Sequence, residues 1–215
     1  YWDKRWKDMF FSSHQGFEPL LKQIMDKGFD GIYIDGTAAY LDDGIFNRAY
    51  AEEKDPRQEM VNFVQEIRAY TTSLNPNFII VSQNPGELLQ QDEFAILLDG
   101  VAQEHVWFDG GISGKPNGDC PLPRKISDIV SQTYRNSLKD ACLDLYEDFP
   151  ESNLHIASEE YLVNLNLAKE KGLKVFTVDY AEKTINILNA TNESRSRGFI
   201  PLVTVKNLDV FIEPR

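Results

Sequence analysis

"GFDGIYIDGTAAY", at positions 28–40, decides how this chain is expected to fold. Gly28 marks the end of a preceding helix, because glycine readily adopts the left-handed backbone at helix ends. The apolar run that follows is typical of a buried strand, yet it ends on Asp35. Active sites of parallel α/β proteins form at the carboxyl ends of strands, where the loops converge. We therefore predict a strand at 31–35 that presents Asp35 to a ligand.

Helices and strands alternate on both sides of this stretch. The spacing of apolar residues predicts helices at 16–27, 57–74 and 158–171. Ser158 is the expected cap of the last helix. Apolar runs between turn signals predict strands at 78–83, 100–107, 174–180 and 201–205. Such alternation is typical of βαβ units, so the sequence predicts an α/β fold with a parallel sheet, in one domain over 1–215.

The segment 109–153 interrupts this alternation. It opens with a loop rich in glycine and proline and continues with a predicted helix at about 127–149. A segment of this length is an insertion or a long connection. It contains the only two cysteines, Cys120 and Cys142, which form no C-x-x-C pair and so argue against a zinc site. Whether these two cysteines form a disulfide stays open at this point.

Composition narrows the classes of partner. The net charge of −12 argues against nucleic acid and suits a cationic or neutral ligand. No stretch reaches the roughly 20 apolar residues of a membrane span. The chain starts at Tyr1 without a methionine, so an upstream segment could have been removed, and the residues give no localisation. Nothing in the pattern requires a cofactor or a metal.

Polar residues close several of the predicted strands. They are Asp35, Gln83 with Asn84, Glu104, and Asp179 with Tyr180. Any single acid here could instead cap the next helix. Two acids on separate strands suit glycoside hydrolysis, in which one carboxyl protonates the leaving oxygen and the other attacks the sugar or activates water. Asp35 and Glu104 are the expected catalytic pair, with Glu104 as proton donor. A separation of about 5 to 5.5 Å would indicate retention, and roughly 6.5 to 9.5 Å inversion.

The expected substrate contacts combine polar groups with aromatic rings that stack on sugars. They are Asp3, Tyr40, Asn84, Trp107, Asp179 and Tyr180. Tyr33 and Phe108 are further aromatic candidates. Aromatic residues at strand ends also commonly belong to the core, and that interpretation stays open. Trp107 and Phe108 follow Glu104 closely and could shield its proton from water.

The order of several blocks resembles a known family. These blocks are "GFDGIYID" with Tyr40, "SQN" with "GELL", "DGVAQEHVWF", "KVFTVDYA" and "RGFIPLVTVKNLD". Together, from about residue 1 to residue 212, they resemble glycoside hydrolase family 114, the endo-α-1,4-polygalactosaminidase group. The resemblance implies a (β/α)8 barrel with Asp35 and Glu104 as the catalytic pair, an amino-sugar polysaccharide as substrate, and a secreted or cell-surface location.

Two features depart from that family. Ala38 stands where the family commonly has a second acid, three positions after the first. Only about six strands are found, counting one at Tyr1–Asp3, where a (β/α)8 barrel has eight. We therefore expect a barrel that lacks its first one or two βα units.

Two alternatives to an active glycosidase stay open. A carbohydrate-binding relative could keep the barrel and lose the chemistry, as Ala38 suggests. A metal-dependent hydrolase using Asp35, Glu104, His105 and Asp179 is disfavoured, because neighbouring residues of a strand point to opposite faces.

Overall fold

The computed structural model describes residues 1–14 and 16–208. The chain divides into two compact units, residues 1–101 and the residues from 102 onward. Hydrogen-bonded strands follow the order β1-β2-β3-β6-β7. The predicted α/β class with a parallel sheet is confirmed, whereas its extent as one barrel domain over 1–215 stays a prediction. The last residues of the family resemblance, after Leu208, lie outside the described residues.

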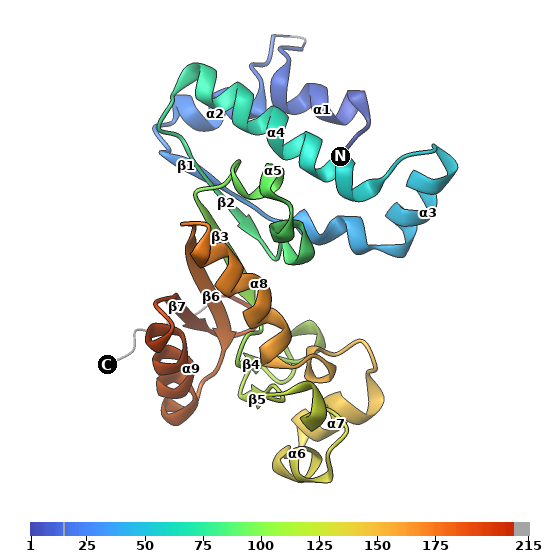
Figure 1. Cartoon of the computed structure of the whole chain (residues 1–215), viewed down its shortest axis with the longest axis vertical. Coiled ribbons are helices and arrows are strands. Elements are labelled where there is room, and N and C mark those ends of the chain that lie inside the picture. Colours follow the sequence, from blue (N-terminus) through green and yellow to red (C-terminus); the bar gives the residue numbers. More distant parts are fainter. Residues whose placement is uncertain (15, 209–215) are drawn as a thin grey trace. The chain divides into compact units, whose positions relative to one another are not determined.

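The first unit packs helices around two parallel strands (Figure 1). Its elements are α1 (Lys4–Phe11), α2 (Leu20–Asp26), β1 (Gly31–Ile34), the 3-10 helix η1 (Thr37–Leu41), α3 (Asp43–Ala51), α4 (Pro56–Leu74), β2 (Ile79–Gln83), the 3-10 helix η2 (Gly86–Gln90), α5 (Asp92–Ala95) and the start of β3 (Gly100–Glu104). β1 pairs with β2 in a register that runs from Gly31 opposite Ile79 to Ile34 opposite Ser82. Both strands therefore end at the same edge.

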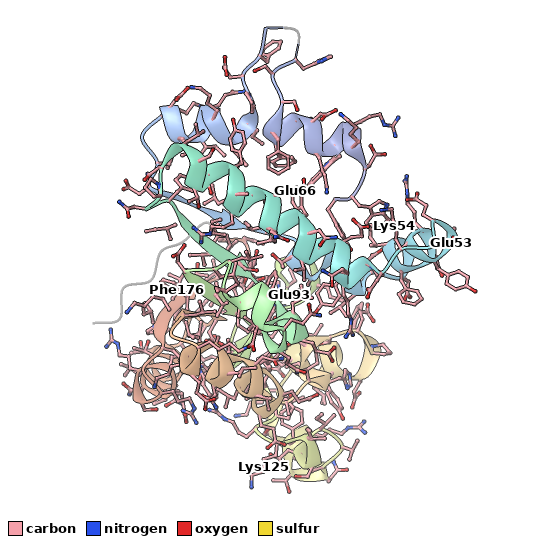
Figure 2. The ribbon with its side chains drawn as sticks, turned by 45° about the horizontal axis from the view of Figure 1, so that its top comes forward. Glu53, Lys54, Glu66, Glu93, Lys125 and Phe176 are labelled. Carbon is pink, nitrogen blue, oxygen red and sulfur yellow. A yellow bond between two sulfur atoms is a disulfide. The ribbon has the colours of Figure 1, made fainter. Side chains whose placement is uncertain are left out.

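Helix α4 supplies the largest part of the first unit's core. Its start is fixed by Asp55, which accepts a hydrogen bond from the backbone of Arg57, and by Pro56 in the first turn. Its buried side chains are Met60, Val61, Phe63, Val64, Ile67 and Thr71. The neighbouring α1 packs aromatic rings on Phe63 and pairs Lys7 with Glu66, which Figure 2 labels.

The second unit holds the remaining strands. Its elements are β4 (Phe108–Asp109), η3 (Ile112–Gly114), β5 (Cys120–Pro121), η4 (Ile126–Asp128), α6 (Gln132–Ser137), α7 (Ala141–Asp148), η5 (Asn153–His155), α8 (Ser158–Glu170), β6 (Lys174–Tyr180), α9 (Thr184–Ser196) and β7 (Ile200–Thr204). β6 pairs in parallel with β7, from Phe176 opposite Ile200 to Tyr180 opposite Thr204. Figure 2 labels Phe176 on β6 and Lys125 at the start of η4. The backbone N–H of His105 donates to the carbonyl of Val178, so the end of β3 lies beside β6.

The long segment 109–153 contributes most of a small buried core. Cys120 and Cys142 form a disulfide. The buried cluster around this disulfide consists of Cys120, Leu122, Tyr134, Leu138, Leu145 and Leu154. The segment is therefore a folded addition to the second unit.

Several local predictions are wrong. The expected strand at Tyr1–Asp3 is absent, because the Asp3 carboxylate caps α1 instead. The strand predicted at 100–107 ends at Glu104, since His105 has a φ of 57° that a strand cannot contain. The helix predicted at 127–149 is two helices separated at Asp140, where φ is 45°. The cap of α8 is Ala157, and Ser158 is the first helical residue.

No helix among the described residues is both long enough and apolar enough to cross a membrane.

Candidate functional site

Glu104, the predicted proton donor, stands at the carboxyl end of β3 in the second unit. β3 stops there because His105 turns the chain through left-handed backbone. The hydroxyl of Tyr180, at the carboxyl end of β6, donates a hydrogen bond to Oε1 of Glu104. Tyr180 is only 1% exposed, so its ring is held in place by its surroundings. The two strand ends thus bring the carboxyl and the phenol into direct contact.

A cluster of charged groups surrounds this contact. Nδ1 of His105 lies 2.6 Å from Oδ1 of Asp109. Lys206, just after β7, places Nζ 3.3 Å from Nε2 of His105 and 3.6 Å from Oδ1 of Asp109. Asn153 donates to the other oxygen of Asp109 over 3.2 Å. The loop that follows Asp109 packs closely against Lys206. A side chain at Gly110 would not fit there, since its Cβ would lie 2.6 Å from Cβ of Lys206.

This geometry places His105 between Lys206 and Asp109. A lysine ammonium only donates hydrogen bonds, so Nε2 of His105 must accept from Lys206. The other ring nitrogen, Nδ1, lies next to Oδ1 of Asp109. His105 therefore links the carboxylate of Asp109 to the ammonium of Lys206.

Asp109 is ionised despite its burial. Burial opposes its charge, but the hydrogen bond and the attraction from His105, aided by Lys206, outweigh it and hold the pKa of Asp109 below its ordinary value. The cluster of Asp109, His105 and Lys206 consequently sets a buried carboxylate beside an ammonium. Balanced charges of this kind are tolerated in a partly buried site.

Asp179, a predicted substrate contact, is completely buried. Its Oδ1 accepts hydrogen bonds from the backbone N–H of Trp107, over 2.6 Å, and of Phe108, over 3.0 Å. Burial raises the pKa of Asp179 to about 7, although these N–H donors oppose the rise. Asp179 therefore supports the turn that follows β3, and its side chain is remote from solvent.

Trp107, another predicted contact, also lies in the interior of the second unit. It is 2% exposed, and its indole N–H donates to Ser194 over 2.8 Å. The guanidinium groups of Arg124 and Arg197 lie 4.9 Å and 4.8 Å from its ring. The indole is consequently buried and already in contact with two guanidinium groups, which matches the core interpretation rather than sugar stacking.

Asp35, in the first unit, directly follows β1. Its carboxylate is exposed and accepts a hydrogen bond of 2.6 Å from the backbone N–H of Gly36. Gly36 has a φ of 77°, which favours glycine, and it turns the chain into η1. An exposed, backbone-anchored carboxylate is available to a ligand.

The other predicted contacts of the first unit differ in their surroundings. Tyr40 is 2% exposed and its hydroxyl donates to the carbonyl of Pro85, so it belongs to the core. Asn84 follows β2 with a φ of 45° and is half-buried. Asp3 is held by Arg5, whose hydrogen bonds lower the pKa of Asp3.

Of the predicted site residues, the structure thus brings Glu104 and Tyr180 into contact within the second unit. The sequence interpretation missed Asp109, Asn153 and Lys206. The spacing of His105 and Asp109, an ionisable pair four positions apart directly after a strand, is the one signal that could have indicated them. Within the described residues, no group of three or more His, Cys, Asp or Glu side chains is arranged to hold a metal ion.

No protein-family model matches the chain. Its sequence is similar to uncharacterized proteins of Deinococcus radiodurans, at 24% identity over 99% of this chain and 52% of that protein, and of Thermotoga maritima, at 26% identity over 98% and 53%. A third, from Methanocaldococcus jannaschii, is 28% identical over 79% and 46%. The chain thus spans about half the length of the curated relatives it matches.

Among solved structures, the chain resembles the glycoside hydrolase domain of PelA from Pseudomonas aeruginosa. The TM-score is 0.56 at 15% identity, over 88% of this chain and 58% of that chain. A variant of the same domain gives a TM-score of 0.51 at 16% identity. This likeness shows that the chain shares the fold of that domain.

Proposed function

We propose that this chain is a glycosidase that uses Glu104 as proton donor and Asp35 as the second carboxylate. The observation that carries the proposal is Glu104 at the end of a parallel strand, hydrogen-bonded by a buried tyrosine within a cluster of fixed charges. The glycoside hydrolase-like fold supports it. Strand-end carboxylates are the groups that glycoside hydrolysis requires.

The chemistry assigns one step to each carboxyl. Glu104 gives its proton to the glycosidic oxygen while the bond from that oxygen to the anomeric carbon breaks, and the bonding electrons leave with the oxygen. Asp35 either attacks the anomeric carbon or removes a proton from the attacking water. Both roles require the carboxylate form of Asp35 and access to the substrate, and the side chain is exposed.

We propose an amino-sugar polysaccharide, cleaved within the chain, as the substrate. The resemblance to the polygalactosaminidase group motivates this choice. The net charge of −12 also suits a polymer whose free amino groups carry positive charge.

Release of reducing ends from a panel of amino-sugar polymers tests the proposal. We expect cleavage of at least one polymer, and a rate at least about 10²-fold lower for Asp35→Asn. Asp43→Asn, at an exposed position in the first turn of α3, is the matched control and should keep the parent rate. An Asp35→Asn rate equal to that of the parent would remove Asp35 from the mechanism.

A binding module without catalysis is the second candidate. Ala38, in η1, favours it, because the related family commonly has an acid at this position. Retention of a polymer on an affinity gel without any release of reducing ends would support this candidate over the enzyme.

A further inference from the structure

Tyr180 is a direct hydrogen-bond partner of Glu104 in the second unit. Its hydroxyl donates to Oε1 of Glu104. Donation of a hydrogen bond to a carboxyl stabilises the ionised form over the protonated one. Because the ring is 1% exposed, the hydroxyl cannot swing away to solvent without displacing its neighbours. Tyr180 is thus built to stabilise the carboxylate that Glu104 becomes after it has given up a proton.

Lys206 acts on the same phenol through its ring. Nζ lies 4.7 Å from the centroid of the Tyr180 ring, within the range of a cation–π contact. A positive charge on the face of a phenol draws electron density from its oxygen, so the hydroxyl becomes a stronger donor. The charge of Lys206 therefore reaches Glu104 through Tyr180.

His105 keeps Lys206 in this position. It accepts from Nζ through Nε2, and its ring lies beside that of Tyr180, with 5.0 Å between the centroids. Asp109 anchors both groups. The backbone of Lys206 is itself held by the carbonyl of Asn117, over 2.7 Å.

We propose that Tyr180 and Lys206 are positioning residues that determine the pH at which Glu104 gives up its proton. This inference rests on the proposed function and adds to it a control of the proton donor by the side chains beside it.

The other ionisable groups around this site in the second unit have defined positions. Tyr161, on α8, lies near both Glu104 and Asp109, and burial raises its pKa, so it stays a neutral phenol. Asp109 opposes the field of Lys206, His105 accepts a hydrogen bond from Lys206, and Asp179 faces the turn after β3. Lys206 brings a positive charge to this group.

The pH dependence of kcat/KM on a cleaved polymer tests the proposal. Tyr180→Phe removes the donor, so Glu104 should hold its proton to higher pH and the alkaline limb should move up by about one pH unit. Lys206→Met should move the limb in the same direction by less, and Lys206→Arg should restore it. Lys174→Met, at the other end of β6, is the matched control and should leave the limb unchanged. A uniform loss of rate with unmoved limbs in Tyr180→Phe and Lys206→Met would overturn the proposal.

Titration of Glu104 by NMR provides a readout that needs no turnover. The protein is labelled with ¹³C at the glutamate carboxyls, and the Glu104 signal is the one missing from Glu104→Gln. We expect its titration midpoint to rise in Tyr180→Phe and, by less, in Lys206→Met. If the midpoint rises but the protein cleaves no polymer, the proposed glycosidase activity is rejected, whereas the proposal that Tyr180 and Lys206 control the titration of Glu104 is supported. Unchanged midpoints in both variants would reject the proposal that Tyr180 and Lys206 affect the titration of Glu104.

Discussion

Asp179 illustrates how one residue at a strand end can support a site without touching a ligand. Its position beside Tyr180 makes it look like a substrate contact in the sequence, yet it is buried and accepts the backbone N–H groups of Trp107 and Phe108. Successive residues of a strand point to opposite faces, so only one member of the pair could reach Glu104. The sequence indicated that Asp179 and Tyr180 close the strand, but not which of the two faces Glu104.

Substitution of Asp179 should change how stability depends on pH. Its folded-state pKa of about 7 exceeds the unfolded value, so the native state binds the extra proton, and the free energy of unfolding falls as pH rises from about 4 to about 7. The fall attributable to this group is on the order of 4 kcal/mol. Asp179→Asn does not titrate, so its stability should fall less over this range.

Urea unfolding of the parent and Asp179→Asn at several pH values measures this difference. Asp148→Asn, at an exposed position at the end of α7, is the control and should follow the parent. Parallel curves for the parent and Asp179→Asn would show that Asp179 is ionised across the whole range.

Helices and strands with a clear periodicity of apolar residues were predictable from the sequence. Features that depend on contacts between residues far apart in the sequence were not. The helix predicted at 57–74 corresponds to α4 because its apolar spacing, proline and cap agree. The strand predicted at 174–180 corresponds to β6. By contrast, the break between α6 and α7 depends on left-handed backbone at Asp140. The disulfide and buried cluster around these helices join residues far apart in sequence, which periodicity does not report.

The disulfide should stabilise the segment 109–153. Cys120 and Cys142 are 22 positions apart, and closing a loop of this length restricts the unfolded chain by about 3 kcal/mol. The double substitution Cys120→Ser with Cys142→Ser should therefore lower the free energy of unfolding by about that amount. Denaturant unfolding measures it, and reduced parent protein should match the double variant. Equal stability of oxidised parent and double variant would contradict the role given to the disulfide.

At the scale of the whole molecule, the predicted site residues are divided between the units. Asp3, Asp35, Tyr40 and Asn84 belong to the first unit, and Glu104, Trp107, Asp179 and Tyr180 to the second. The class of fold followed from the alternation of strands and helices, since that pattern admits few architectures. The charges around Glu104 could not be predicted, because Lys206 and Asp109 meet His105 only through the folded loops.

The rate of polymer cleavage by Glu104→Gln tests the central claim most directly. Glutamine keeps the shape of the side chain but has no proton to give to the leaving oxygen. Reducing-end release should fall by about 10²- to 10⁴-fold while binding of the polymer is largely kept. Glu170→Gln, at the exposed end of α8, should retain the parent rate. Near-parental cleavage by Glu104→Gln would contradict the account.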